Sequence, residues 1–443
     1  MFINRWVPAT MESPSVLNLD SDLAATATTR IHETLRNLTW AVTVHYLCFL
    51  PVLAGVSFGV DFLKTQDYRD FPGFLIDQPP TTFLTGFASW DGAWYTDIAR
   101  SGYKYDPRQG SHVVFFPLYP CLGWILSRLT GLREEISLLL ISHSALIGAI
   151  ALLRQYVRAR FQDWPADKCD FALIALLCLP GSMFMRMAYS ESLFLLLVVA
   201  GAFGILRRWD PLAVSACFGA ASGIRAVGAG LVLLSIYYAW NFTGKSGQPL
   251  SRLSRASLSL AVIPVSLWGL IGYMEFLYWQ YGDPLLFQSN HIHYDSRSGS
   301  PVLEKLWNLI TLEPVWSVYI GDSKRHWTTY EPVLNPLFTL RFMNPVFFGL
   351  ACAMVIVGGC QKLLNRYELL LCAILVGIPY ATKGHDGGML GVSRYMSVVF
   401  PAWIVLAHIL WQMPADLRAA ITGIGFALLA INSAQFAAWY MLF

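Results

Sequence analysis

The sequence is dominated by apolar segments long enough to cross a lipid bilayer. A membrane-spanning helix needs about 20 mainly apolar residues, and about eleven segments near that length follow one another along the chain. They are 38–60, 113–130, 135–157, 170–187, 190–206, 211–240, 256–279, 345–360, 367–381, 395–411 and 417–440. Charged residues make up only 13% of the chain, against about 25% in soluble domains. The sequence therefore predicts an all-α polytopic membrane protein.

Basic residues between these segments indicate how the chain crosses the membrane. Cytoplasmic loops are enriched in Lys and Arg, and if 113–130 crossed, the basic clusters at 154–168 and 207–208 would lie outside. Pro117 and Pro120 interrupt that segment, and proline removes a helix hydrogen bond and clashes with the preceding turn. We therefore expect 113–130 to lie on the outer leaflet or to dip into it.

A second irregular segment is SGIRAVGAG, residues 222–230, where three glycines surround Arg225. A charge at the bilayer centre costs about 2.5–3.5 kcal/mol, which makes such a residue a functional candidate. Non-helical backbone at that depth must be buried in protein or line a cavity. We therefore expect 211–240 to turn back on itself there, so that Arg225 faces water, protein or a ligand.

With these two adjustments every basic cluster falls on the cytoplasmic side. The clusters are 154–168, 207–208, 245–255 and 362–366. The prediction is a single membrane domain, 1–443, of about eleven spans with an external C-terminus. Segment 1–37 is then cytoplasmic, 61–134 is a first external loop with juxtamembrane helices, and 281–344 is a long external loop. The short turns 186–192 and 381–395 also face outward.

Asp91 is the first candidate for chemistry, because it lies just beyond the first apolar segment in WDGAWYTDIARSGY, residues 90–103. The rings of Trp90, Trp94 and Tyr95 offer flat apolar faces that suit sugars, whose hydroxyl groups bond to carboxylates. The alternative is that the rings form an interfacial aromatic belt and that Asp91 caps a helix.

A second acid and two arginines complete the charged candidates. Glu191 lies in the turn RMAYSES with Tyr189 and Ser190, on the same predicted face as Asp91. Its alternative role is to stabilise a helix N-terminus. Arg225 and Arg394 are candidate anion ligands, since arginine forms bidentate bonds to phosphate. For Arg394 the alternative is an interfacial anchor.

Metal and nucleotide sites have little support. His291, His293 and Asp295 form an HxHxD cluster that could ligate a divalent ion, but three ligands on a loop are a weak signal, and we expect no metal or other cofactor. His112 is a candidate substrate ligand or an ordinary surface histidine. There is no GxxxxGK[ST], HExxH or CxxC motif, and a net charge of +3 does not favour a nucleic-acid partner.

Five ordered blocks resemble one known family, the GPI mannosyltransferase 2 (PIG-V) family and its prokaryotic homologues. The residues that carry the resemblance are WDGAWYTDIARSGY followed by FFPLYP, then LPGSMFMRMAYSESLF, SGIRAVG, GDPLLF and SRYMSVVFPAW. The blocks keep their order from about residue 80 to 405. Eukaryotic members often carry a second acid two residues after the first, where this chain has Ala93. That difference argues against a two-carboxylate metal site in this loop.

The resemblance implies a GT-C type glycosyltransferase that moves a sugar, usually mannose, from a polyprenyl-phosphate donor. The acceptor would be lipid- or protein-linked, on the noncytoplasmic face of a plasma membrane or endoplasmic reticulum. It implies that Asp91 is at the active centre, and we expect it to act as general base in an inverting displacement. Arg225 and Arg394 would then bind the donor phosphate, with Glu191, Tyr189 and Ser190 positioning the substrates.

Two other functions remain open from the sequence. A transporter or flippase of lipid-linked sugars would also use broken helices and an intramembrane arginine. No inverted repeat is visible, and both acids lie on one face, which disfavours that function. A noncatalytic subunit of a glycosyltransferase complex is disfavoured by the intact Asp91.

Overall fold

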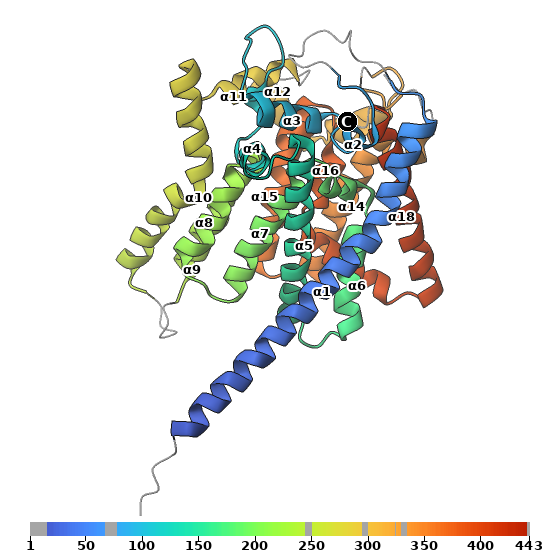
Figure 1. Cartoon of the computed structure of the whole chain (residues 1–443). Coiled ribbons are helices and arrows are strands. Elements are labelled where there is room, and N and C mark those ends of the chain that lie inside the picture. The colour runs from blue at the N-terminus through green and yellow to red at the C-terminus, as the bar shows by residue number, and fades with distance from the viewer. Residues whose placement is uncertain are drawn as a thin grey trace, which may run out of the picture.

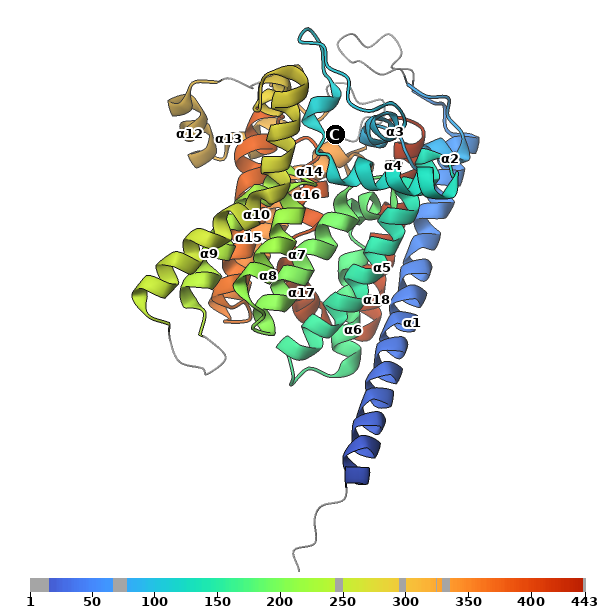
Figure 2. The ribbon, with the colours of Figure 1, turned by 60° about the vertical axis from the view of Figure 1, so that its left-hand side comes forward.

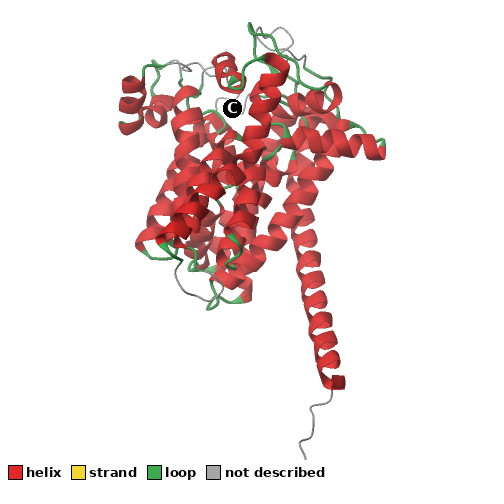
Figure 3. Cartoon of the chain, turned by 90° about the vertical axis from the view of Figure 1, so that its left-hand side faces the viewer, coloured by secondary structure: helices red, strands yellow, loops and turns green. Residues whose placement is uncertain are grey.

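A computed structural model describes residues 16–66, 78–243, 250–294, 300–323, 325–328 and 335–440, and throughout these residues the regular structure is helical (Figure 3). The α-helices are α1 Val16–Phe62, α2 Phe83–Gly86, α3 Asp91–Ser101, α4 Leu118–Thr130, α5 Glu134–Arg160, α6 Ala166–Leu177, α7 Glu191–Leu206, α8 Pro211–Ser222, α9 Val232–Asn241, α10 Arg252–Tyr281, α11 Leu286–Ser289, α12 Val302–Ile310, α13 Glu313–Trp316, α14 Leu340–Cys360, α15 Arg366–Pro379, α16 Val392–Ser397, α17 Phe400–Trp411 and α18 Ala415–Ala437. Short 3₁₀ or π turns are η1 His112–Val114, η2 Pro180–Arg186, η3 Ala226–Leu231, η4 Asn290–His293, η5 Ser317–Tyr319, η6 Pro336–Phe338 and η7 Tyr380–Gly384. The prediction of an all-α fold is confirmed.

Length and composition support a polytopic membrane protein. Within the described residues, five helices are long and apolar enough to cross a bilayer, and a sixth crossing is added if α6 and η2, bent by 85°, form one span. The five are residues 32–62 of α1, α5, α10, α14 and α18. Shorter apolar helices, such as α7, α8 and α17, occupy other expected segments. The number of about eleven spans therefore stays a prediction.

Helix α1 packs along α18, so the first and last long helices of the chain lie side by side (Figures 1 and 2). Gly55 and Gly59 form a GxxxG pair, and small residues of this kind let two helix backbones approach closely. A Cβ atom built on Gly59 would lie 2.1 Å from the carbonyl oxygen of Ala434, and one on Gly55 would lie 2.2 Å from that of Ala430. The crossing therefore requires glycine at both positions.

Replacing Gly59 with alanine is expected to lower the free energy of unfolding by about 1–3 kcal/mol, because α1 and α18 must move apart. Gly349→Ala in α14 is the matched control, since nothing lies within 4 Å of a Cβ there. Alanine at that position should stabilise the helix by about 0.5–1 kcal/mol. Thermal unfolding in detergent measures both changes, and equal effects of the two variants would contradict the close crossing.

Helix α4 lies across the end of the bundle rather than along it (Figure 2). Pro117 is its N-cap, so the prolines that interrupt the apolar segment mark where this 13-residue helix begins. Tyr119 and Gly123 face α5, whereas Trp124 and Leu129 are exposed at 48% and 80%. Segment 113–130 therefore forms a short helix that does not run along the bundle, and its position on or within the outer leaflet stays a prediction.

Segment 211–240 turns back on itself, as predicted. Helix α8 ends at Ser222, Arg225 adopts an extended conformation, and η3 leads into α9. The hydroxyl of Tyr238, near the end of α9, donates a 2.7 Å hydrogen bond to the carbonyl of Trp209, just before α8 begins. The two helices therefore form a hairpin with Arg225 at its tip.

Ion pairs join the helices at the end of the bundle opposite α3 and α4. Arg154 of α5 makes a bidentate pair with Asp170 of α6, with N···O distances of 2.7 and 2.8 Å. Arg160 of α5 donates to Glu368 of α15 at 3.1 Å. The predicted basic cluster at 154–168 therefore also ties α5 to its neighbours.

Candidate active site

Four charged side chains from distant parts of the sequence form one connected cluster. Arg394 donates from Nη1 to Oδ2 of Asp91 and from Nε to Oε1 of Glu191. Arg225 donates from Nη1 to the same Oε1 of Glu191. The predicted acids and arginines therefore alternate along a single chain of contacts, Asp91, Arg394, Glu191 and Arg225.

Local backbone geometry directs Asp91 into this cluster. Helix α3 begins at Asp91, and the preceding residue, Trp90, has φ 57° and ψ −124°, which a non-glycine residue seldom adopts. Such a conformation costs about 1–3 kcal/mol and persists only where the surrounding structure enforces it. Tyr189 contributes to that restraint, because its hydroxyl accepts a 3.0 Å hydrogen bond from the backbone N–H of Asp91.

The arginines are also positioned by irregular backbone. Arg394 lies in α16, which follows Gly391 at φ 67°, and Asn344 of α14 accepts a hydrogen bond from the backbone N–H of Ser393. Arg225 is the extended residue at the tip of the α8–α9 hairpin, and its guanidinium lies 4.3 Å from the ring centroid of Tyr395. Stacking on an aromatic ring keeps a guanidinium flat and limits its rotation.

Exposure differs sharply along the cluster. The side chain of Glu191 is fully buried, those of Arg225 and Arg394 are 6% and 8% exposed, and that of Asp91 is 30% exposed. Within the described residues, Oε2 of Glu191 and Nη2 of Arg225 are buried and make no hydrogen bond. Asp91 is therefore the acid that a solute can reach, and the buried charges behind it retain capacity for further polar contacts.

The capping alternative is wrong for Asp91. Trp90 is the N-cap of α3, and the Asp91 carboxylate points to Arg394 rather than to backbone amides. Glu191 is the first residue of α7, so it does lie at the positive end of that helix. Its carboxylate nevertheless binds the two arginines. Arg394 is buried, which rules out an interfacial anchor.

Tyr189, Ser190 and Tyr95 join the two acidic turns beneath the charged cluster. All three are buried, and the Tyr95 hydroxyl lies 3.2 Å from Oγ of Ser190. The Tyr189 ring also lies under Arg394, with 4.7 Å between the guanidinium and the ring centroid. The structure brings these predicted residues next to the acids, as supports for Asp91 and Arg394.

The aromatic residues around Asp91 do not form a lipid-facing belt. Trp94 is 6% exposed and stacks on Phe115, with ring centroids 5.4 Å apart. Trp90 is only half-buried and packs against Trp439 from the C-terminal end, at 5.3 Å between centroids. Of the predicted sugar-binding rings, Trp90 is therefore the one that shares partial exposure with Asp91.

His112 is buried within the segment that leads from α3 to α4, not at its surface. Its Nδ1 accepts a hydrogen bond from the backbone N–H of Lys104 at 3.0 Å, which leaves the proton on Nε2. Nε2 lies 3.1 Å from Oδ2 of Asp97, which also accepts from Nζ of Lys104. His112 thus braces the loop, and no contact joins it to the charged cluster.

The stability of the fold at acid pH should depend on the contact between His112 and Asp97. The close contact with His112, together with a hydrogen bond from Lys104, lowers the pKa of Asp97 below its usual value of about 3.9. A lowered folded-state pKa stabilises the fold above about pH 3.9, and this contribution is lost as the pH falls toward the folded pKa. Asp97→Asn should therefore lower the unfolding temperature by a constant amount between pH 5 and 8, and by less below about pH 4. A difference that grows on acidification would contradict the brace.

Two residues of the HxHxD cluster, His291 and His293, are among the described residues, and Asp295 lies outside them. Nε2 of His293 donates a 3.1 Å hydrogen bond to the carbonyl of Pro107. Among the described residues no group of three or more His, Cys, Asp or Glu side chains has metal-site geometry.

Sequence reasoning missed four residues that shape the site. Asn344 positions α16, Tyr395 stacks on Arg225, and Trp439 packs on Trp90. Tyr294 packs on Trp94, and burial with the nearby charge of Asp91 raises its pKa. Tyr395 could have been found from the sequence, because it directly follows Arg394. The others are brought to the site from distant helices and loops.

Comparison with known proteins identifies the family. The family model described as "Mannosyltransferase (PIG-V)" matches residues 36–291, which include Asp91, Glu191 and Arg225. GPI alpha-1,6-mannosyltransferase 2 of Rattus norvegicus is 32% identical over 209 residues, which are 44% of this chain and 41% of that protein. The protein of the same name from Homo sapiens is 31% identical over 225 residues, 46% of this chain and 44% of that one.

These matches span less than half the length of the curated relatives. Among solved structures, the Archaeoglobus fulgidus oligosaccharyltransferase tethered to an acceptor peptide is similar with a TM-score of 0.46 and 12% identity, covering 90% of this chain and 55% of that one. That likeness is too distant to define the fold more closely. The family model alone covers more than half of the chain, so the protein belongs to the mannosyltransferase (PIG-V) family.

Proposed function

We propose that this protein transfers mannose from a polyprenyl-phosphate donor to a lipid- or protein-linked acceptor on the noncytoplasmic face of its membrane. The observation that carries the proposal is Arg394, which bridges the acid of the first external loop to the acid of the second turn. The proposed reaction removes a proton and releases a phosphate. A partly exposed carboxylate can accept the proton, and the buried arginines next to it can bind the phosphate. Family membership supports mannose as the sugar.

In the proposed reaction Asp91 is the general base. It takes the proton of an acceptor hydroxyl while that oxygen bonds to the anomeric carbon of mannose. The bond from this carbon to the phosphate oxygen breaks, and polyprenyl phosphate leaves with the electron pair, so the anomeric configuration inverts. Oδ2 of Asp91 is held by Arg394, which leaves Oδ1 as the atom to receive the proton.

Arg225 and Arg394 would stabilise the charge on the departing phosphate. Both are already paired with carboxylates, so the phosphate would add to this cluster rather than occupy an unpaired cationic pocket. Nη2 of Arg225 has no partner among the described residues and is the donor best placed to bind it. Preorganised donors in a buried site stabilise developing charge more effectively than donors in water.

Arg225→Lys tests the phosphate role. Lysine retains a positive charge for Glu191 but lacks the second guanidinium nitrogen. The KM for polyprenyl-phosphate mannose should rise about tenfold or more, as expected for the loss of a charge-assisted hydrogen bond, with the KM for acceptor nearly unchanged. Arg252→Lys, exposed at the start of α10, is the matched control. An unchanged donor KM would refute the assignment.

An assay with the protein in proteoliposomes and labelled donor separates sugar transfer from sugar transport. Labelled mannose should appear on the acceptor, whereas a flippase would move labelled donor across the vesicle without transferring it. The basic clusters at the opposite end of the bundle support the noncytoplasmic face for the charged cluster. We also propose a GT-C type fold, about eleven spans and a prokaryotic-type origin. Labelling of single-cysteine variants in the first external loop from outside the vesicle tests the face.

A further inference from the structure

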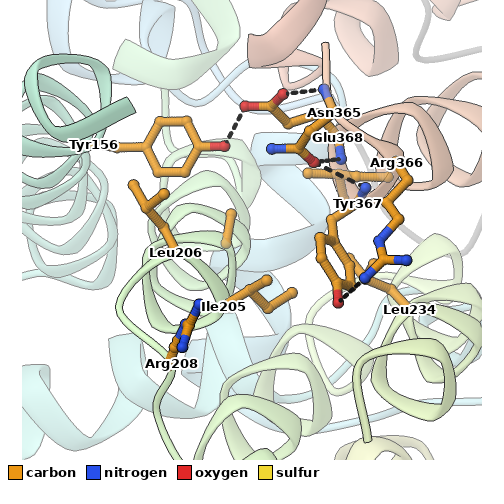
Figure 4. Close-up of a pocket in the computed structure, with 11 residues that line it drawn as sticks. Tyr156, Ile205, Leu206, Arg208, Leu234, Asn365, Arg366, Tyr367 and Glu368 are labelled. Atoms are coloured by element: carbon orange, nitrogen blue, oxygen red, sulfur yellow. Dashed lines mark hydrogen bonds between the residues drawn. The ribbon is translucent and has the colours of Figure 1, made fainter. Parts of the chain in front are cut away.

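A pocket of about 250 Å³ opens at the end of the bundle opposite the charged cluster. It lies where α5 and α7 end and α15 begins, with Leu234 from the first turn of α9 on its wall. Figure 4 shows the side chains that line it. Glu191 is in the first turn of α7, and Ile205 and Leu206 of the pocket are in its last turn. At 1.5 Å per residue the pocket is therefore about 22 Å from the acids, too far to belong to the same site.

The walls and the mouth of this pocket differ in chemistry. Ala202, Ile205 and Leu206 of α7 form an apolar wall, which is continued by Leu234 of α9 and Leu371 of α15. Arg208 and Arg366 are both exposed and line the same pocket. Figure 4 shows Arg208 near Ile205 and Leu206, and Arg366 on the opposite side of the pocket next to Tyr367. A site of this kind is amphiphilic.

The polar groups deeper in the pocket are already satisfied. Glu368 accepts hydrogen bonds from the Tyr156 hydroxyl at 2.6 Å and from Arg160 at 3.1 Å, and Asn365 caps α15. Arg366 donates a 3.3 Å hydrogen bond to the Tyr367 hydroxyl and lies over the rings of Tyr237 and Tyr367. Among the described residues, however, neither Arg208 nor Arg366 has a carboxylate within ion-pair distance. The available positive charge of the pocket is therefore at its mouth.

We propose that this pocket binds an anionic phospholipid of the leaflet at that end, with its headgroup between Arg208 and Arg366 and part of one acyl chain along the α7 wall. Basic pockets between membrane helices on the cytoplasmic side are suited to anionic headgroups. A volume of about 250 Å³ is below the roughly 300–1,000 Å³ that encloses a whole drug-sized ligand. Only the headgroup and the upper part of a chain would enter, and the remainder would stay in the bilayer.

Delipidated protein in detergent can be titrated with phosphatidylglycerol, phosphatidylcholine or glycerol 3-phosphate, with binding followed by native mass spectrometry and thermal unfolding. Phosphatidylglycerol should bind and raise the unfolding temperature, and the other two should have little effect. The variant Arg208→Gln/Arg366→Gln should bind phosphatidylglycerol about tenfold or more weakly. Arg207→Gln/Arg252→Gln, two exposed arginines outside the pocket lining, is the matched control and should bind normally.

Three results would overturn the proposal. Equal binding of phosphatidylcholine would mean that the arginines do not select the headgroup. Normal binding by Arg208→Gln/Arg366→Gln would place the lipid elsewhere, and protection by glycerol 3-phosphate would identify a site for a soluble anion. Mannose transfer is not used as a readout, so the outcome is independent of the proposed function.

Discussion

Asp91→Asn is expected to lower kcat of mannosyl transfer by about 10²–10⁴-fold, the usual contribution of a general base. Asparagine has nearly the same size and can still accept a hydrogen bond from Arg394, but it cannot take a proton. Arg394 keeps its pair with Glu191, and Asp91 is the most exposed member of the cluster, so the unfolding temperature should fall less than for a change at Glu191. Initial rates with labelled donor and thermal unfolding of the same sample measure the two effects.

Asp106→Asn is the matched control for this variant. Asp106 is a partly exposed acid of the same loop, and its carboxylate contacts Arg108 and Gln109 rather than the charged cluster. Transfer by this variant should be close to that of the unmodified protein. Near-normal turnover by Asp91→Asn would show that Asp91 is not the general base, whatever the control shows.

Unlike Asp91→Asn, the variant Glu191→Gln should cause a large loss of stability. Its carboxylate is fully buried between Arg225 and Arg394, and removing one partner of a buried ion pair costs about 3–5 kcal/mol because a charge is left uncompensated. Arg394 keeps Asp91, whereas Arg225 has no other acid among the described residues. The free energy of unfolding in detergent measures the loss.

A second variant distinguishes electrostatics from packing. Glu191→Gln combined with Arg225→Met removes both charges, and should recover most of the lost stability while remaining inactive, since buried pairs can often be replaced by apolar groups. Glu134→Gln is the matched control, because Glu134 also begins a helix but is 18% exposed and pairs with an exposed arginine. It should cost about 0–1 kcal/mol. Equal losses for Glu134→Gln and Glu191→Gln would contradict the buried pairing.

Most of the helical architecture could be predicted because its signals are local. Apolar runs define the helices, and the glycines and lone arginine of 222–230 predict the break between α8 and α9. The prolines of 113–130 predict a short helix that does not follow the bundle. The number of spans was harder to predict, because α15 and the pair α16 and α17 are short or broken, and hydropathy does not give their depth.

The candidate site was predicted as a set of residues rather than as an arrangement. Asp91, Glu191, Arg225 and Arg394 each stood out as a charge in an apolar setting. His112 was also a candidate, either as a substrate ligand or as an ordinary surface histidine, yet it is buried and lies next to Asp97, because the sequence does not show which nearby acid a histidine meets. The supporting roles of Tyr189 and Tyr95 were also hidden, since an aromatic residue near an acid can equally face a substrate.

By itself, the sequence determined an all-α membrane protein of the PIG-V family, with two acids and two arginines placed for chemistry. Hydropathy, proline and glycine act over a few residues, so their consequences can be predicted without knowing the packing. The tertiary structure decided that Arg394 joins Asp91, 303 residues away, to Glu191, and that Asp91 alone among the four is partly exposed. Burial and ion pairing depend on which distant helices meet, and that depends on the packing of the whole bundle.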